Sequence, residues 1–275
     1  TNAAERHAIL QRLESEEGSA PELLAPLVAH MKPPIPTEFP AEPVIPGMLE
    51  ITVPGRSDGP PLKYVVQLPP EYDPYRRFPC MVVLHPFGGS PEKQIDWWAG
   101  PYSADRRTRL GQATRHGYVV IAPAWTTSGQ TEYEHSFREH QAVLKSLRDA
   151  LRRFSIDTDR VFLSGHSMGG DAAWDIGVAH PDLWAGVIPF VARGERYVRF
   201  YRDNAKGIPF YFVGGELDRG WLSDQATRYD RYLKTTGFQT TLSVYRGRGH
   251  EPFSEEALVV FEWLNRHRRG TAPVE

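Results

Sequence analysis

The sequence predicts an α/β protein built on a mostly parallel, eight-stranded sheet with helices on both faces. From about Met48, β-rich segments alternate with segments of helical pattern, as in doubly wound sheets. Several β-rich segments are nearly continuous apolar runs, such as Met81-Val82-Val83-Leu84 and Tyr118-Val119-Val120-Ile121, which suit parallel strands buried on both faces. The 275 residues suffice for one large domain of this kind with a substantial core.

Residues 1–46 are expected to form an arm outside this domain, which should span residues 47–270. The arm should contain two helices, over Ala3–Glu16 and Glu22–Met31, because a glycine and a proline interrupt the helical pattern between them. The connector Lys32–Pro46 is rich in proline, which favours an extended path.

The main domain should contain eight strands, over Met48–Val53, Leu62–Leu68, Pro79–His85, Tyr118–Ala122, Arg160–Ser164, Gly186–Phe190, Pro209–Val213 and Thr241–Tyr245. Helices are predicted over Asp105–His116, Glu134–Phe154, Met168–His180, Ser223–Thr236 and Glu255–Arg268. Between the sixth and seventh strands only Val191–Ile208 is available, which is too short for a large helical cap. The pocket is therefore expected to be open from that side.

The segment Gly165-His166-Ser167-Met168-Gly169 has G-x-S-x-G spacing, and it lies between a predicted strand and a predicted helix. A tight turn at this junction lifts the serine hydroxyl clear of the sheet, and glycines two positions away avoid steric clashes. The turn also leaves the backbone N–H of Met168 at a helix N-terminus, where it can face a developing oxyanion. Ser167 is therefore the predicted nucleophile of a serine hydrolase.

A serine nucleophile needs a base to take its proton and an acid to orient that base. In the chain order serine, acid, histidine, the acid should follow the seventh strand, where Asp218 lies, with Glu216 as its main rival. Asp224 and Asp230 fall inside the next predicted helix and are weaker candidates. The loop after the eighth strand carries His250 behind a glycine, which makes His250 the predicted general base.

A second oxyanion donor should come from the loop after the third strand. Pro86 has no N–H, so Phe87 is the predicted donor, with Gly88 as the alternative. His166 is expected to be structural, because neighbours on a turn point in different directions. His135 and His140 are five residues apart, which on a single helix would place them about 140° apart, so no metal site is expected there.

Composition excludes several other classes of protein. A formal net charge of −2 gives no electrostatic footprint for nucleic acid, and no apolar run approaches the roughly 20 residues that span a bilayer. The single cysteine, Cys80, excludes an internal disulfide and is expected in the core. No cofactor is expected. Oligomeric state and compartment stay open: a soluble chain is expected, cytoplasmic or exported after removal of a leader.

Three stretches of the chain carry a resemblance to known hydrolases. They are Leu68–Pro74, Val82–Gly89 and Phe154–Gly170, of which the last is the most specific. Over roughly residues 48–268 the chain resembles the α/β-hydrolase superfamily. Within it, the chain is similar to the group of polyhydroxybutyrate depolymerases, feruloyl esterases and prolyl-oligopeptidase-like predicted peptidases. The resemblance implies a catalytic triad and oxyanion hole at the positions derived above. Pro86 departs from the glycine usual in this group.

The resemblance and the residues together leave three functions open. The favoured function is hydrolysis of a carboxylic ester through an acyl-enzyme, and the second is a peptidase of the prolyl-oligopeptidase type. The third is a non-catalytic binding module on the same fold. The serine disfavours haloalkane dehalogenases and epoxide hydrolases, which use aspartate there, and dienelactone hydrolases, which use cysteine. A small-molecule ester or a peptide is the expected substrate, and Trp97, Trp98, Trp125 and Trp221 are predicted to wall its pocket.

Overall fold

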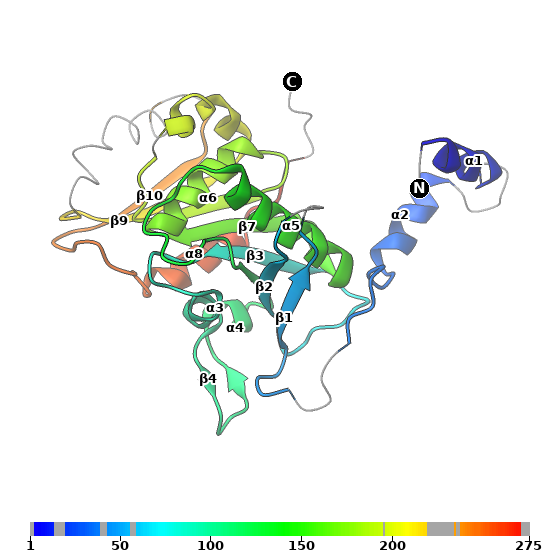
Figure 1. Cartoon of the computed structure of the whole chain (residues 1–275), viewed down its shortest axis with the longest axis horizontal. Helices are drawn as coiled ribbons and strands as arrows, with labels where there is room; N and C mark the ends of the chain where they lie inside the picture. Colours follow the sequence, from blue (N-terminus) through cyan, green and yellow to red (C-terminus); the bar gives the residue numbers. More distant parts are fainter. Residues whose placement is uncertain are drawn as a thin grey trace.

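A computed structural model of the chain shows one large sheet between two layers of helices (Figure 1). It describes residues 3–13, 20–38, 43–55, 59–194, 196–218, 234 and 237–270. The sheet has eight strands in the order β1-β2-β6-β3-β7-β8-β9-β10. All eight predicted strands are present, as β1 (Met48–Val53), β2 (Leu62–Gln67), β3 (Phe78–Leu84), β6 (Val119–Pro123), β7 (Ile156–His166), β8 (Gly186–Phe190), β9 (Phe210–Gly215) and β10 (Thr240–Tyr245).

Strand direction confirms the mostly parallel sheet. β2 runs antiparallel to both of its neighbours, β1 and β6, whereas the other neighbouring strands pair in parallel. The central strand β3 is buried along its whole length. Its side chains alternate between two cores, with Val82 packed on one face and Val83 on the other. A strand covered on both faces reads as a continuous apolar run, which is why the sequence identified it.

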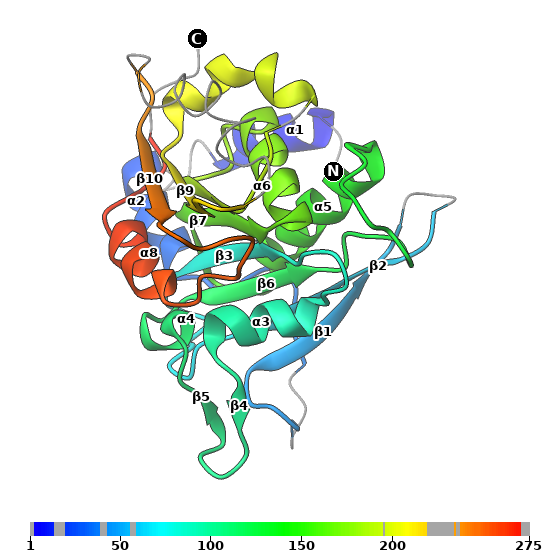
Figure 2. The same cartoon turned by 90° about the vertical axis from the view of Figure 1, so that its left-hand side faces the viewer.

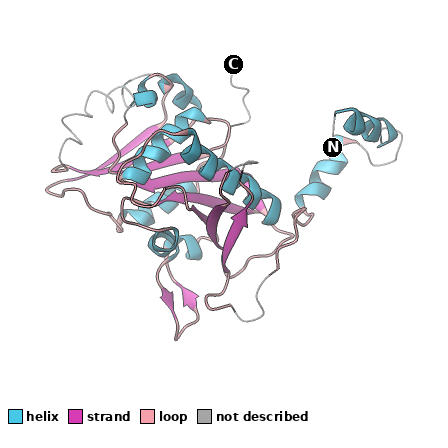
Figure 3. Ribbon diagram, in the orientation of Figure 1, coloured by secondary structure: helices cyan, strands magenta, loops and turns pink. Residues whose placement is uncertain are grey.

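Helices cover both faces of the sheet (Figures 2 and 3). One face packs against α5 (Phe137–Arg153) and α6 (Met168–Ala179). The other face packs against α3 (Pro91–Ala99), α4 (Gln112–Arg115) and α8 (Glu256–Leu264). Between β8 and β9 the described residues form only two short 3₁₀ helices, η1 (Arg196–Arg199) and η2 (Arg202–Gly207). The expectation of no large cap therefore holds for the described part of this connection.

The longest helix, α5, shows why the local sequence is helical. Ser136 is its N-cap, and Ser136 and Glu139 form a capping box in which each side chain accepts from the other residue's backbone N–H. Beyond the cap, small and apolar residues recur at helical spacing and are buried against the sheet, among them Val143 and Leu147. The cap defines where the helix begins, and the buried stripe defines which face meets the sheet.

The predicted helix over Asp105–His116 is largely wrong. Tyr102–Ser103 (β4) and Thr108–Arg109 (β5) form a small antiparallel hairpin, and only α4 is helical. The reason is tertiary, because the buried Arg109 side chain forms an ion pair with Asp96 and donates to Gln67. The sequence interpretation also missed α3, which begins at the N-cap Ser90 with a proline in its first turn. The helix predicted over Ser223–Thr236 lies outside the described residues, apart from Lys234.

The N-terminal arm contains the two predicted helices, as α1 (Ala3–Leu13) and α2 (Pro21–Ala29), and the predicted end of the first, residues 14–16, lies outside the described residues. Figure 1 shows both helices apart from the sheet. The arm contacts the main domain at the end of α2 and just beyond it. Arg77 donates to the carbonyl oxygen of Val28 at 2.8 Å, and the backbone N–H of Ile35 donates to the carbonyl oxygen of Arg152. Within the described residues, no helix is both long and apolar enough to cross a membrane.

Loss of the α5 cap should measurably weaken the fold. We expect Ser136→Ala to lower the free energy of unfolding by about 1 kcal/mol, because the N-cap oxygen no longer accepts from the first turn. Urea unfolding followed by circular dichroism measures the change. Ser128→Ala, at an exposed serine outside any helix, serves as the control. Equal stability of the two variants would contradict the role of the cap.

Candidate active site

Ser167 lies on the sharp turn between β7 and α6, as predicted. Its φ is +53°, a left-handed conformation that a residue other than glycine rarely adopts. The turn is possible because its flanking glycines have no side chains. A Cβ on Gly165 would lie 2.0 Å from the carbonyl oxygen of Gly169, and one on Gly169 would lie 2.3 Å from that of Leu84. The serine is therefore held in a strained position by close backbone contacts.

The structure brings His250 and Asp218 to this serine. His250 Nε2 lies 2.8 Å from Ser167 Oγ, and His250 Nδ1 lies 2.8 Å from Asp218 Oδ2. The Asp218 side chain is buried, whereas the His250 side chain is 48% exposed. The imidazole can therefore accept the serine proton at Nε2 while Nδ1–H donates to the carboxylate. The serine, the ring and the carboxylate form one continuous hydrogen-bonded path.

The rival acids do not reach this path. Glu216 accepts a hydrogen bond from the backbone N–H of Gly247 at 2.8 Å, so it supports the loop that leads to His250. Asp224 and Asp230 lie outside the described residues. Among the candidates that the structure describes, Asp218 is the carboxylate in contact with His250.

Ser167 opens into a cavity of about 460 Å³. Asp218 and His250 line it together with Phe87 and Met168, the two residues predicted to donate to an oxyanion. Met168 is the first residue of α6, so its backbone N–H has no acceptor within the helix. An adjoining cavity of about 320 Å³ shares Phe87 and Met168 as lining. The two cavities therefore lie next to each other at Phe87 and Met168, the two predicted oxyanion donors.

The predicted aromatic wall is wrong for the three tryptophans that the structure describes. Trp98 and Trp125 are completely buried, and Trp97 packs against the His166 ring with their centroids 4.4 Å apart. None of the three lines either cavity at Ser167. The missed helix α3 explains two of them, because it directs Trp97 and Trp98 toward the sheet. Trp221 lies outside the described residues.

His166 is structural, as expected, and its contacts tie the site together. Its Nδ1 accepts from Gln94 of α3 at 2.9 Å, and its Nε2 donates to the carbonyl oxygen of Pro252 at 3.2 Å. Pro252 is two residues beyond His250, so this bond connects the end of β7 to the loop that carries the imidazole. Burial lowers the pKa of His166 to about 3, which keeps the ring neutral.

His135 and His140 do not lie on one helix, contrary to the sequence interpretation. His135 lies before α5 rather than in it, and both rings face the carboxylate of Asp175 on α6. The assumption that they share one helix was wrong because the cap at Ser136 starts the helix between them. Within the described part of the chain, no group of three or more histidine, cysteine, aspartate or glutamate side chains could hold a metal ion.

A side chain at Gly165, the first glycine of the turn around Ser167, should lower the stability of the fold. We expect Gly165→Ala to cost about 1–3 kcal/mol in the free energy of unfolding, because its Cβ has no space beside Gly169. Urea unfolding measures this loss. Gly207→Ala is the matched control, because a Cβ there meets no atom within 4 Å. Unchanged stability of Gly165→Ala would show that the turn can relax.

The neutral His166 should make stability depend on pH. Its ordinary pKa is 6.5, so in the unfolded chain it binds a proton below that pH, whereas the folded ring stays neutral down to about pH 3. Stability should therefore fall as the pH falls below 6.5, by up to about 1.4 kcal/mol per pH unit from this group. Urea unfolding between pH 7 and 5 measures the slope. His166→Gln should give a shallower slope, and an equal slope would refute the assignment.

Solved structures of several hydrolases superpose on the chain. A thermostable esterase matches with a TM-score of 0.66 and 22% identity, over 82% of this chain and 64% of its own length. An S-formylglutathione hydrolase from Staphylococcus aureus matches with a TM-score of 0.56 and 15% identity, over 80% and 97%. A ferulic acid esterase matches with a TM-score of 0.61 and 14% identity, over 80% and 98%. At these identities, the likeness establishes a shared α/β-hydrolase fold.

The sequence pattern of the Dienelactone hydrolase family matches residues 78–259, which include Ser167, Asp218 and His250. The prediction that a serine separates this chain from dienelactone hydrolases is therefore wrong at the level of the family. The match spans about two thirds of the chain, from β3 into α8, with serine rather than cysteine at position 167. The chain belongs to the dienelactone hydrolase family, a family of hydrolases within the α/β-hydrolase superfamily.

Proposed function

We propose that the chain is a serine esterase that hydrolyses carboxylic esters through an acyl-enzyme intermediate. The observation that carries this proposal is the hydrogen-bonded path from Ser167 through His250 to Asp218 at an open cavity. A serine hydroxyl becomes a competent nucleophile only when a base accepts its proton, and this path supplies both the base and the carboxylate that orients it.

In the first half of the reaction, Ser167 Oγ attacks the ester carbonyl carbon while His250 Nε2 takes the hydroxyl proton. The carbonyl electron pair moves onto oxygen, and the backbone N–H groups of Met168 and Phe87 would stabilise that oxyanion. Asp218 stabilises the imidazolium that forms. When the tetrahedral intermediate collapses, the bond to the alcohol oxygen breaks, and His250 donates its proton to the departing alcohol.

In the second half, a water molecule replaces the alcohol. His250 takes a proton from the water, which attacks the acyl carbon, and collapse of the second intermediate returns the proton to Ser167 Oγ. The products are the carboxylic acid and the free enzyme. Because His250 is about half exposed, water has a route to it without a large opening motion.

Two further observations support an ester substrate. Several hydrolases of the same fold are esterases by name, including the thermostable esterase and the ferulic acid esterase. The complete Ser167–His250–Asp218 path also argues against a binding module, which would have no need to keep a strained serine in contact with a histidine.

Removal of the serine hydroxyl should abolish turnover. We expect wild type to hydrolyse p-nitrophenyl acetate and to be labelled by a fluorophosphonate, with Ser167→Ala losing labelling and at least about 10³-fold in kcat. Nitrophenolate release and intact-protein mass give the two readouts. Ser103→Ala in the β4–β5 hairpin is the matched control and should keep both. Labelling of wild type without turnover of any ester would contradict the esterase proposal and favour a peptidase.

A further inference from the structure

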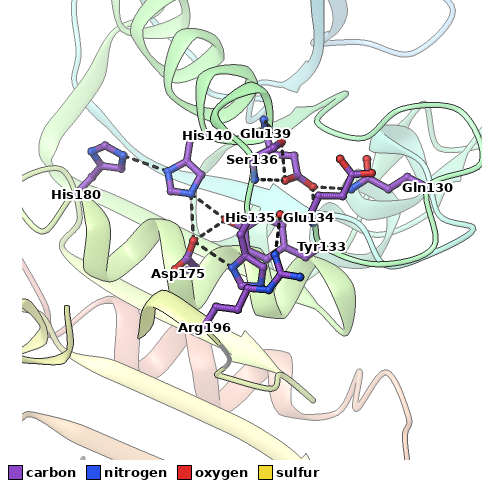
Figure 4. A network of polar contacts seen from close by, with 10 residues as sticks. All are labelled: Gln130, Tyr133, Glu134, His135, Ser136, Glu139, His140, Asp175, His180 and Arg196. Atoms are coloured by element: carbon purple, nitrogen blue, oxygen red, sulfur yellow. Dashed lines mark hydrogen bonds and ion pairs between the residues drawn. The ribbon is translucent and has the colours of Figure 1, made fainter. Parts of the chain in front are cut away.

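Figure 4 shows a second contact between an aspartate and histidines, in which Asp175 faces His135 and His140, and His135 lines the same cavity as Ser167. Asp175 Oδ2 accepts from the Tyr133 hydroxyl at 2.7 Å and lies 3.1 Å from His140 Nε2 and 3.6 Å from His135 Nδ1. Tyr133 and His135 also line the cavity that contains Ser167. Asp175 stands two turns of α6 beyond the serine, so one helix connects the nucleophile to this second contact.

Asp175 is a buried carboxylate that stays ionised. Its side chain is only 2% exposed. Burial by itself raises the pKa of Asp175, but the neighbouring His135, His140 and Tyr133 side chains outweigh burial and hold the pKa below its usual range. The donors that face Asp175 Oδ2 offset part of the cost of burying this charge, so the carboxylate anchors these side chains.

His135 is held in a defined position by this anchor. Its φ is +58°, and its side chain is only 6% exposed. The ring centroid lies 4.2 Å from that of Tyr133, and Nδ1 faces Asp175. A left-handed conformation at a residue other than glycine costs free energy and persists only where the surroundings enforce it. The contacts with Asp175 and Tyr133 supply that enforcement at a residue that lines the cavity.

The remaining lining of the cavity is partly apolar, and its charged groups offer little to a negatively charged substrate. Among the described lining residues, Glu132, Asp171 and Asp218 contribute three carboxylates and Arg193 contributes one guanidinium. The Asp171 carboxylate also accepts from the Arg193 backbone N–H. A substrate with its own carboxylate would therefore meet an excess of negative charge, whereas a neutral group that donates and accepts hydrogen bonds would not.

The adjoining cavity is less charged than the first. Among the described residues that line it, none is acidic, and none is lysine or arginine. Hydroxyl and amide groups are contributed by Thr126, Thr127, Ser128 and Gln130. Both cavities thus offer uncharged hydrogen-bonding partners, and the exposed Phe87 is a large aromatic side chain that lines both, whereas Trp97, Trp98 and Trp125 line neither.

We propose that the substrates are neutral esters that carry hydroxyl groups near the scissile bond, and that His135, held by Asp175, is a specificity-determining residue for them. This inference rests on the proposed esterase function. An imidazole can accept from a hydroxyl or donate to it, so it suits such a group in either orientation. An unhydroxylated ester would remove water from His135 and its polar neighbours without replacing the lost hydrogen bonds.

Two matched pairs of esters test the preference. Ethyl lactate against ethyl propanoate probes the acyl side, and glyceryl monoacetate against propyl acetate probes the alcohol side. We expect kcat/KM of wild type to be roughly tenfold or more higher for the hydroxylated ester of at least one pair. Acid release in a pH-stat measures all four substrates, and p-nitrophenyl acetate reports the basic esterase reaction.

Two variants test the role of the contact between Asp175 and His135. His135→Gly removes the ring, and glycine adopts the positive φ without strain. Asp175→Asn preserves the shape of the anchor but removes its charge. We expect both to reduce the preference for the hydroxylated ester at least about threefold, with the larger loss in His135→Gly. His116→Gly is the matched control, because it removes a ring that stacks on Phe261 on the opposite face of the sheet. It should keep the wild-type ratio of kcat/KM within each pair of esters.

The outcomes separate the two proposals. Hydrolysis of p-nitrophenyl acetate with equal kcat/KM within both pairs overturns the hydroxylated substrate while the esterase function stands. A wild-type preference that persists in folded His135→Gly overturns the role of His135. A preference lost in His135→Gly and kept in His116→Gly supports the inference. If wild type hydrolyses neither p-nitrophenyl acetate nor any of the four esters, the esterase function fails and the inference fails with it.

Discussion

The close contact between the backbone of Gly165 and that of Gly169 is the constraint on which the site depends. It lets α6 begin directly where β7 ends, with Ser167 in a left-handed conformation at the junction. Because α6 is rigid, the same contact orients every residue that the helix carries. Met168 lies at its first position, and Asp175 lies two turns further along. One glycine pair therefore positions the nucleophile, a candidate oxyanion donor and the buried carboxylate behind the cavity wall.

Parallel pairing brings the other two groups to the serine. β10 pairs with β9 in parallel, with Tyr245 opposite Gly215, so the loops that follow both strands start at the same edge of the sheet. Asp218 follows one strand and His250 the other, and their side chains meet there. His166 adds a tie between this loop and the end of β7 through Pro252. The site is thus held by backbone pairing on one side and by a neutral buried histidine on the other.

The partition of aromatic and polar side chains gives the cavity its character. Tryptophans from α3 and from the end of β6 fill the two cores, where they contribute apolar burial to the fold. The described lining beside Ser167 combines polar side chains, among them Tyr133 and His135, with the apolar Phe87, Met168, Val191 and Leu217. The proposed preference for hydroxylated esters depends on the polar part of this lining, where an apolar group would displace water without replacing its hydrogen bonds.

The sequence by itself determined the eight strands, the elbow at Ser167 and the order in which Asp218 and His250 follow it. These features depend on local signals: continuous apolar runs, a glycine pair around a serine, and the position of a residue just after a strand. Only the tertiary structure decided that Arg109 makes a hairpin where a helix was predicted, that α3 buries its tryptophans, and that His135 and His140 meet at Asp175. Those outcomes depend on contacts between residues far apart in the chain, and such contacts have no signature in local composition or periodicity.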